Sequence, residues 1–201
     1  MAAIEKTLSA IERFFERAAK VAGIETTASE QLKPSSDSKI DALARKFDLA
    51  IPDEVRRFWK RGLKYRHLSV KEGTDGFATA GFDWYTLQYL ARDLPMYRGK
   101  IAPIYPADSD QRRLLEKGIP LSYSEPQIVW DPSVGIRHFS THNDLEPAVT
   151  RTLGEFLEHW LEAGCFTSHE IKRWLPKVKH LVPGRIPPGK NLWIKYYKKV
   201  F

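Results

Sequence analysis

The spacing of apolar residues changes along the chain, and this order of patterns limits the possible folds more than any other feature. Ile4, Leu8, Ile11 and Phe15 recur three to four residues apart, which predicts an amphipathic helix over residues 3–22. Further helices are expected over 38–47, 52–61, 86–94, 112–117 and 152–164, and strands over 65–71, 77–82, 101–105, 127–130 and 136–139. Helices, then strands with an inserted helix, then a helix predict an α+β fold with a twisted, mostly antiparallel sheet packed with helices.

Capping residues, prolines and glycines at the expected helix ends support several of these helices. Ser38 and Asp41 have the spacing of a capping box. Pro52 is expected at the first helical position, where its missing N–H costs nothing, and Gly62 is expected to end that helix in a left-handed conformation. Pro95 is expected to end the helix that begins after Tyr85.

Composition excludes several classes of protein. The chain has 42% hydrophobic and 28% charged residues, as soluble globular proteins do. Cys165 is the only cysteine, so neither an internal disulfide nor a four-cysteine metal site is possible. Charged residues such as Glu5 and Glu12 interrupt the first apolar stretch, and no run approaches the ~18 apolar residues of a membrane span. We therefore expect a cytoplasmic protein without a membrane span.

Positive charge is concentrated at the C-terminal end. Residues 167–201 contain nine Lys or Arg and one acid, which gives 9 − 1 = +8, and the rest of the chain carries 23 − 24 = −1. Such a field attracts acidic partners. The last ten residues, LWIKYYKKVF, mix aromatics with lysines, a pattern that fits stacking on nucleobases, a protein-binding hot spot or a docked terminal strand. The candidate partner-binding residues are Lys172, Arg173, Lys177, Lys179, Arg185, Trp193, Lys195 and Tyr197.

Residues that could carry chemistry are scattered. His138 and His142 are four apart but follow a predicted strand, so their spacing does not favour a metal. Asp108 and Asp110 could form an acid–base pair and are interpreted as turn and capping residues. Cys165 is interpreted as a small buried side chain, and His159 is expected on the solvated side of its helix. We expect neither a cofactor nor a metal.

Three landmarks occur in a familiar order. They are a helix that opens with Ile-Pro-Asp-Glu and contains Phe58-Trp59, a Phe-Asp-Trp-Tyr segment at 82–85, and a late hairpin followed by a Thr-Leu-Gly-Glu-Phe-Leu helix. Together they resemble the SUKH (Smi/Knr-type) superfamily over roughly residues 38–165. The residues that carry the resemblance are Ile51, Pro52, Phe58, Trp59, Asp83, Trp84, Phe156 and Leu157.

The resemblance implies an immunity protein that binds a cognate toxin and blocks it by steric occlusion, without catalysis. It divides the chain into an N-terminal helix and linker (1–37), a SUKH-like domain (38–166) and a basic extension (167–201). Arg61-Gly62-Leu63 replaces the Asn-Gly-Gly-like ending of the family. Because the body is neutral and the extension basic, we expect the toxin to offer an acidic or mixed contact surface. Two alternatives stay open: a nucleic-acid-binding protein that uses the basic extension, and a small hydrolase.

Overall fold

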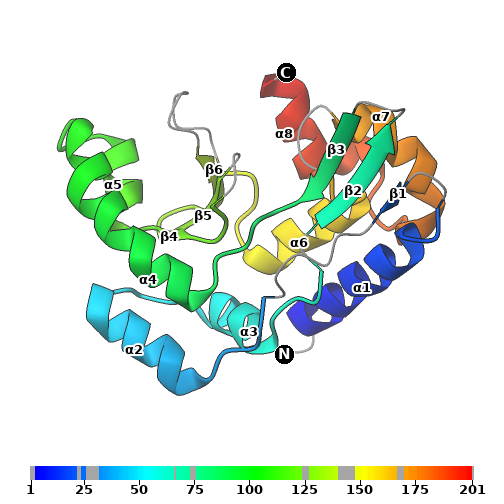
Figure 1. Cartoon of the computed structure of the whole chain (residues 1–201). Coiled ribbons are helices and arrows are strands. Elements are labelled where there is room, and N and C mark those ends of the chain that lie inside the picture. Colours follow the sequence, from blue (N-terminus) through cyan, green and yellow to red (C-terminus); the bar gives the residue numbers. More distant parts are fainter. Residues whose placement is uncertain are drawn as a thin grey trace. The chain divides into compact units, whose positions relative to one another are not determined.

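The computed structural model divides the chain into two compact units (Figure 1). Unit 1 comprises residues 1–31, 63–83 and 154–201, and unit 2 comprises residues 32–62 and 84–153. Within these, the structure describes residues 3–21, 24–25, 32–65, 67–72, 76–123, 127–139, 148–166 and 170–200. The division differs from the expected segments 1–37, 38–166 and 167–201, because the first helix and the basic extension belong to the same unit.

Unit 1 combines one sheet with four helices in the described part of the chain. Its strands are β1 (Ile24–Glu25), β2 (His67–Glu72) and β3 (Gly76–Gly81), and its helices are α1 (Ala3–Ala18), α6 (Leu153–Glu162), α7 (Glu170–Val178) and α8 (Leu192–Val200). Short 3-10 turns occur at Lys179–Leu181 and Pro188–Lys190. The sheet is antiparallel in the order β1-β2-β3, with Val70 opposite both Ile24 and Ala78.

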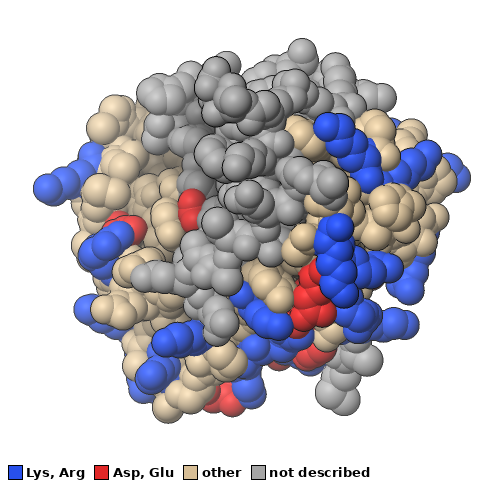
Figure 2. Space-filling model, turned by 45° about the vertical axis from the view of Figure 1, so that its right-hand side comes forward, with Lys and Arg blue, Asp and Glu red and all other residues tan. Residues whose placement is uncertain are grey.

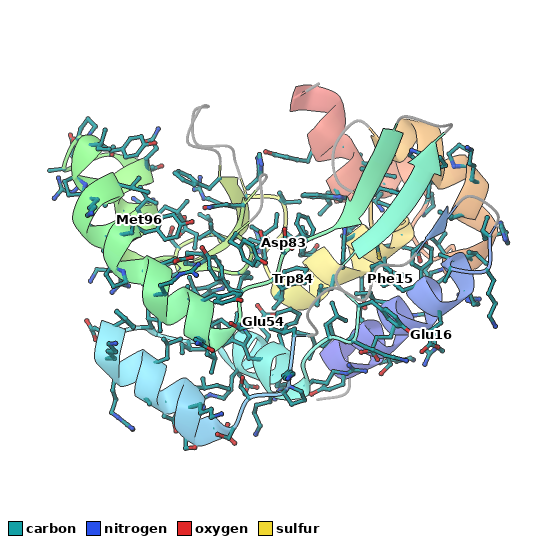
Figure 3. All side chains as sticks on the ribbon, in the orientation of Figure 1. Phe15, Glu16, Glu54, Asp83, Trp84 and Met96 are labelled. Carbon is teal, nitrogen blue, oxygen red and sulfur yellow. The ribbon has the colours of Figure 1, made fainter. Side chains whose placement is uncertain are left out.

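Aromatic rings form the core of unit 1. Phe82, directly after β3, lies 5.2 Å from the ring of Trp160 on α6 and 5.8 Å from that of Trp193 on α8. Phe15 points from α1 toward α6 (Figure 3), and its ring centroid is 6.4 Å from that of Trp160. The apolar stripe predicted for the first helix is therefore buried against α6, which explains why α1 belongs to this unit.

Unit 2 holds the remaining described elements. Its helices are α2 (Asp37–Phe47), α3 (Asp53–Arg61), α4 (Leu87–Met96) and α5 (Asp110–Lys117), and its strands are β4 (Ile119–Pro120), β5 (Gln127–Asp131) and β6 (Gly135–Phe139). The sheet is antiparallel in the order β4-β5-β6, with Val129 opposite Arg137. Phe58 and Trp59 of α3 are fully buried, and the Phe58 ring lies 5.0 Å from that of Trp84.

The mixed α+β class and the 127–139 hairpin are confirmed, with differences at several boundaries. The described strands form two three-stranded sheets rather than a single one. Ser36, not Ser38, caps α2, because its side chain accepts the N–H of Lys39. Pro52 takes the cap position of α3 rather than the first helical one. The first helix ends at Ala18, before the predicted residue 22.

Gly62 ends α3 as predicted, but not in the predicted left-handed helical conformation. It has φ +69° with an extended ψ of −177°, and its N–H donates to the carbonyl of Phe58. A Cβ at this position would lie 2.2 Å from the carbonyl oxygen of Leu32, so the close approach of backbone also requires glycine.

The prediction that Pro95 ends its helix is wrong. Pro95 lies inside α4, and the chain continues as a π-helix over Tyr97–Ile101 and a 3-10 turn over Ala102–Ile104, where a strand was expected. A proline inside a helix removes one i→i−4 hydrogen bond, and π-turns change that bonding pattern locally. Within the described residues, no helix is long and apolar enough to cross a membrane.

Candidate protein-binding surface

The basic extension folds as helices rather than as a terminal strand. Its last segment is α8, and the side chains of Trp193, Ile194 and Tyr196 are buried. Trp193 is 0% exposed, and its indole N–H donates to the carbonyl of Phe166 at 3.0 Å. Trp193 is therefore a core residue, which corrects its prediction as a partner-contact residue.

The other candidate residues of the extension lie at the surface or outside the described side chains. Lys177, Lys179, Arg185 and Lys195 are exposed. The Lys177 ammonium sits 3.8 Å from the ring centroid of the buried Trp174, so this tryptophan is not available for stacking either. The side chains that lie outside the described part are Lys172, Arg173 and Tyr197. Nucleic-acid binding stays a prediction that rests on exposed charge.

Polar anchors on α6 fasten the extension. The carbonyl oxygen of His159 accepts from the Asn191 side chain at 2.8 Å, and its Nδ1 accepts the N–H of Leu192 at 3.1 Å. Both oxygens of the Glu162 carboxylate accept backbone N–H groups, from Gly184 and Arg185, at 2.9 Å. His159 was expected in solvent and is buried instead, because a segment more than thirty residues away covers it. Burial lowers the pKa of its imidazole, against the opposing effect of Glu155, Glu158 and Glu162.

The residues that carry the SUKH resemblance are mostly structural. Phe156, Leu157, Phe58, Trp59 and Trp84 are fully buried. Ile51, Pro52 and Asp83 are half-buried, at the start of α3 and just after β3. The burial of the aromatic members explains their place in the pattern without assigning any of them a contact with a partner.

The residues considered for catalysis do not converge within the described chain. His138 lies in β6, where burial lowers its pKa to about 4, and His142 falls outside the described residues. Asp108 is exposed, and Asp110 pairs with Arg113 at 2.9 Å in the first turn of α5. Cys165 is buried as predicted, and burial raises the pKa of its thiol. No group of three metal-ligating side chains occurs among the described residues.

One face of α4 has the composition of a protein interface. Tyr89, Arg92, Asp93 and Met96 follow the i, i+3, i+4, i+7 spacing and therefore share a face. Arg92 has a side chain 67% exposed, and Met96 is 43% exposed. The guanidinium of Arg92 lies 4.9 Å from the Tyr89 ring centroid. Tyrosine, arginine and methionine are enriched in interfaces relative to other surfaces.

Tyr123 extends this face. It is 38% exposed, and its ring lies 6.2 Å from that of Tyr89 and 5.3 Å from that of Tyr85. We call Tyr89, Arg92, Asp93, Met96 and Tyr123 the α4 surface.

A buried polar network supports the α4 surface. The Tyr85 hydroxyl donates to Asp93 at 3.1 Å and lies 3.2 Å from the Tyr97 hydroxyl, which also accepts from Gln127 at 2.6 Å. The hydrogen bond from Arg92 lowers the pKa of Asp93, with a further contribution from Tyr85, although burial opposes it. Burial, followed by the Tyr97 hydrogen bond, raises the pKa of Tyr85. These bonds fix Asp93, and through its ion pair at 2.6 Å they orient Arg92.

The α4 surface was not predicted from the sequence. The apolar residues of this helix predict only its buried side, and of these Leu90 and Leu94 are buried. The opposite stripe of Tyr89, Arg92 and Met96 was visible in the same periodicity. Tyr123 could not be placed beside it, because that contact joins residues more than thirty positions apart.

The surface charges are mixed. In the face drawn in Figure 2, Asp and Glu side chains lie among the Lys and Arg side chains. In unit 2 the basic residues of α3 pair with acids of α2: Arg56 with Asp41 at 2.7 Å, and Lys60 with Asp37 at 2.6 Å. Much of the charge on these two helices is therefore neutralised locally.

Comparisons with protein-family models, with curated proteins and with solved structures found no match to this chain.

Proposed function

We propose that this chain is a binding protein that recognises a protein partner through the α4 surface, and that it acts as an immunity protein by occluding a toxin. The observation that carries the proposal is the cluster of the exposed residues Arg92, Met96 and Tyr123 with the half-buried Tyr89. Interfaces place most of their binding energy in a few aromatic and arginine side chains. The toxin and the steric mechanism come from the SUKH resemblance, and the surface supplies the contact chemistry.

Preorganisation favours this surface over other exposed residues. The hydrogen bonds among Tyr85, Asp93 and Tyr97 hold the helix face before any partner arrives. A side chain that is already ordered loses less conformational entropy on binding. The pairing of Arg92 with Asp93 presents both signs of charge, which fits a partner with apolar and mixed-charge contacts.

Growth rescue tests this function. The chain is co-expressed with the product of the toxin gene beside its own, and we expect cells to survive and the two proteins to co-purify. The double variant Arg92→Ala/Tyr123→Ala should lose both effects. Ile104→Ala is the matched control, because Ile104 is 76% exposed in the same unit but lies outside the α4 surface. Failure of the unmodified chain to rescue growth refutes the immunity function. Rescue by the double variant refutes the assignment of the surface.

A further inference from the structure

A hollow of about 380 Å³ lies in unit 1. The residues of the α4 surface belong to unit 2, so none of them lines this hollow. Helix α1 contributes Lys6, Thr7 and Arg13 to its lining, α6 contributes Glu158 and Glu162, and the segment before α8 contributes Arg185. Its volume falls in the range of roughly 300–1,000 Å³ that is typical of ligand pockets. Two segments distant in sequence, α1 and the segment before α8, therefore bring three cations to one cavity, and α6 adds two acids.

The three cations are exposed side chains that the acids of the lining neutralise only in part. Among the described residues, Lys6, Arg13 and Arg185 form no ion pair. The lining carries 3 − 2 = +1, since Glu158 and Glu162 oppose the three bases. Unpaired cations that face a partly enclosed space attract an anion more strongly than cations in bulk water do.

The wall that carries Arg185 is fixed in advance. The Glu162 carboxylate uses one oxygen for the N–H of Gly184 and the other for the N–H of Arg185, both at 2.9 Å. Gly184 has φ +73°, a left-handed turn that glycine adopts without strain. The backbone of Arg185 is therefore held at the rim, and the Glu162 carboxylate is engaged by the protein rather than free for a ligand.

We propose that this hollow binds an organic oxyanion, a small molecule with one phosphate or carboxylate group on an apolar body. Lys6, Arg13 and Arg185 receive the anion through charge-assisted hydrogen bonds. Ala10, Leu161 and Ile186 line the remaining wall and favour an apolar body. Glu158 repels a second negative group and so disfavours polyphosphates. The proposal is independent of the proposed toxin binding.

Isothermal titration calorimetry at low salt tests the site with phenyl phosphate, benzoate and inorganic phosphate. We expect one organic anion to bind per chain, and the tighter of phenyl phosphate and benzoate identifies the oxyanion. Arg13→Gln and Arg185→Gln should each weaken binding at least about tenfold, the usual effect of losing one charge-assisted hydrogen bond. Glu158→Gln should tighten it. Lys190→Gln is the matched control, because it removes an exposed cation of the same unit that does not line the hollow.

Three results would overturn the proposal. The first is the failure of both organic anions to bind to the unmodified chain. The second is equal affinity for inorganic phosphate and phenyl phosphate, because an apolar wall would then contribute nothing. The third is a loss in Lys190→Gln as large as in Arg13→Gln, which would indicate attraction to net charge alone. Circular dichroism of each variant shows whether it remains folded.

Discussion

Acid should destabilise the protein through His138. This histidine is buried in β6, and burial lowers its pKa from 6.5 to about 4. The unfolded chain therefore binds a proton at His138 at a higher pH than the folded chain does. The contribution of His138 to the free energy of unfolding is constant above neutral pH and falls as the pH drops from 6.5 toward 4. This difference between the unfolded and the folded pKa of His138 corresponds to about 3 kcal/mol of folding stability in total. About 2 kcal/mol of that stability is lost by pH 5.

Urea unfolding at several pH values, followed by far-UV circular dichroism, measures this loss. Other groups also titrate, so the informative quantity is the difference between the unmodified chain and His138→Gln. The variant should lose about 2 kcal/mol less between pH 8 and pH 5. His180→Gln removes an exposed histidine and should behave as the unmodified chain does. Equal acid sensitivity in His138→Gln and the unmodified chain would refute the reasoning.

Further predictions concern the anchors and the core of unit 1. Glu162→Ala removes the acceptor of two backbone N–H groups and should lower the free energy of unfolding by about 1–3 kcal/mol. It should also expose residues 182–190 to limited proteolysis, and an unchanged cleavage pattern would contradict this prediction. Trp193→Ala should cost about 3–5 kcal/mol in urea unfolding, and a loss below about 1 kcal/mol would mean that α8 is not docked. The raised pKa and the burial of Cys165 predict that a thiol reagent at pH 8 reacts only after unfolding, so immediate labelling of the native chain would be inconsistent with the core described here.

Local patterns predicted the elements whose stability is local. The 127–139 hairpin has turn residues between two apolar runs, and it forms with Val129 opposite Arg137. The helix before Gly62 carried both a start and a stop signal, and both act near the predicted positions. The apolar stripe of the first helix identified Phe15 as a core residue, which the structure confirms.

Long-range contacts determine the conformation and burial of the residues for which the sequence-based prediction was wrong. The segment after residue 192 is rich in aromatic and β-branched residues, which favour strands, yet it is helical because Trp193 and Tyr196 pack on the core of unit 1. His159 lies on the polar side of its own helix and is buried by Asn191 and Leu192. No pattern within a single helix contains that information.

The two candidate sites also differ in whether a local sequence pattern could have predicted them. The α4 stripe could have been found from periodicity, because Tyr89, Arg92 and Met96 share a face in any helix over this segment. The hollow that contains Arg13 and Arg185 could not, because α1 and the segment before α8 are joined only by the fold. The charge of Arg185 predicted that it contacts a partner, but the sequence did not predict that residues of α1 and α6 lie beside it.

The affinity of the chain for the toxin that the proposed immunity function requires, sought as the product of the gene beside its own, tests the central claim most directly. Titration calorimetry of the two purified proteins should give a stoichiometric complex. Tyr123→Ala should weaken this complex at least about thirtyfold, the loss that a hot-spot residue produces, and Ile104→Ala should leave its affinity unchanged. Absence of a complex, or a complex that Ile104→Ala weakens and Tyr123→Ala does not, would contradict recognition through the α4 surface.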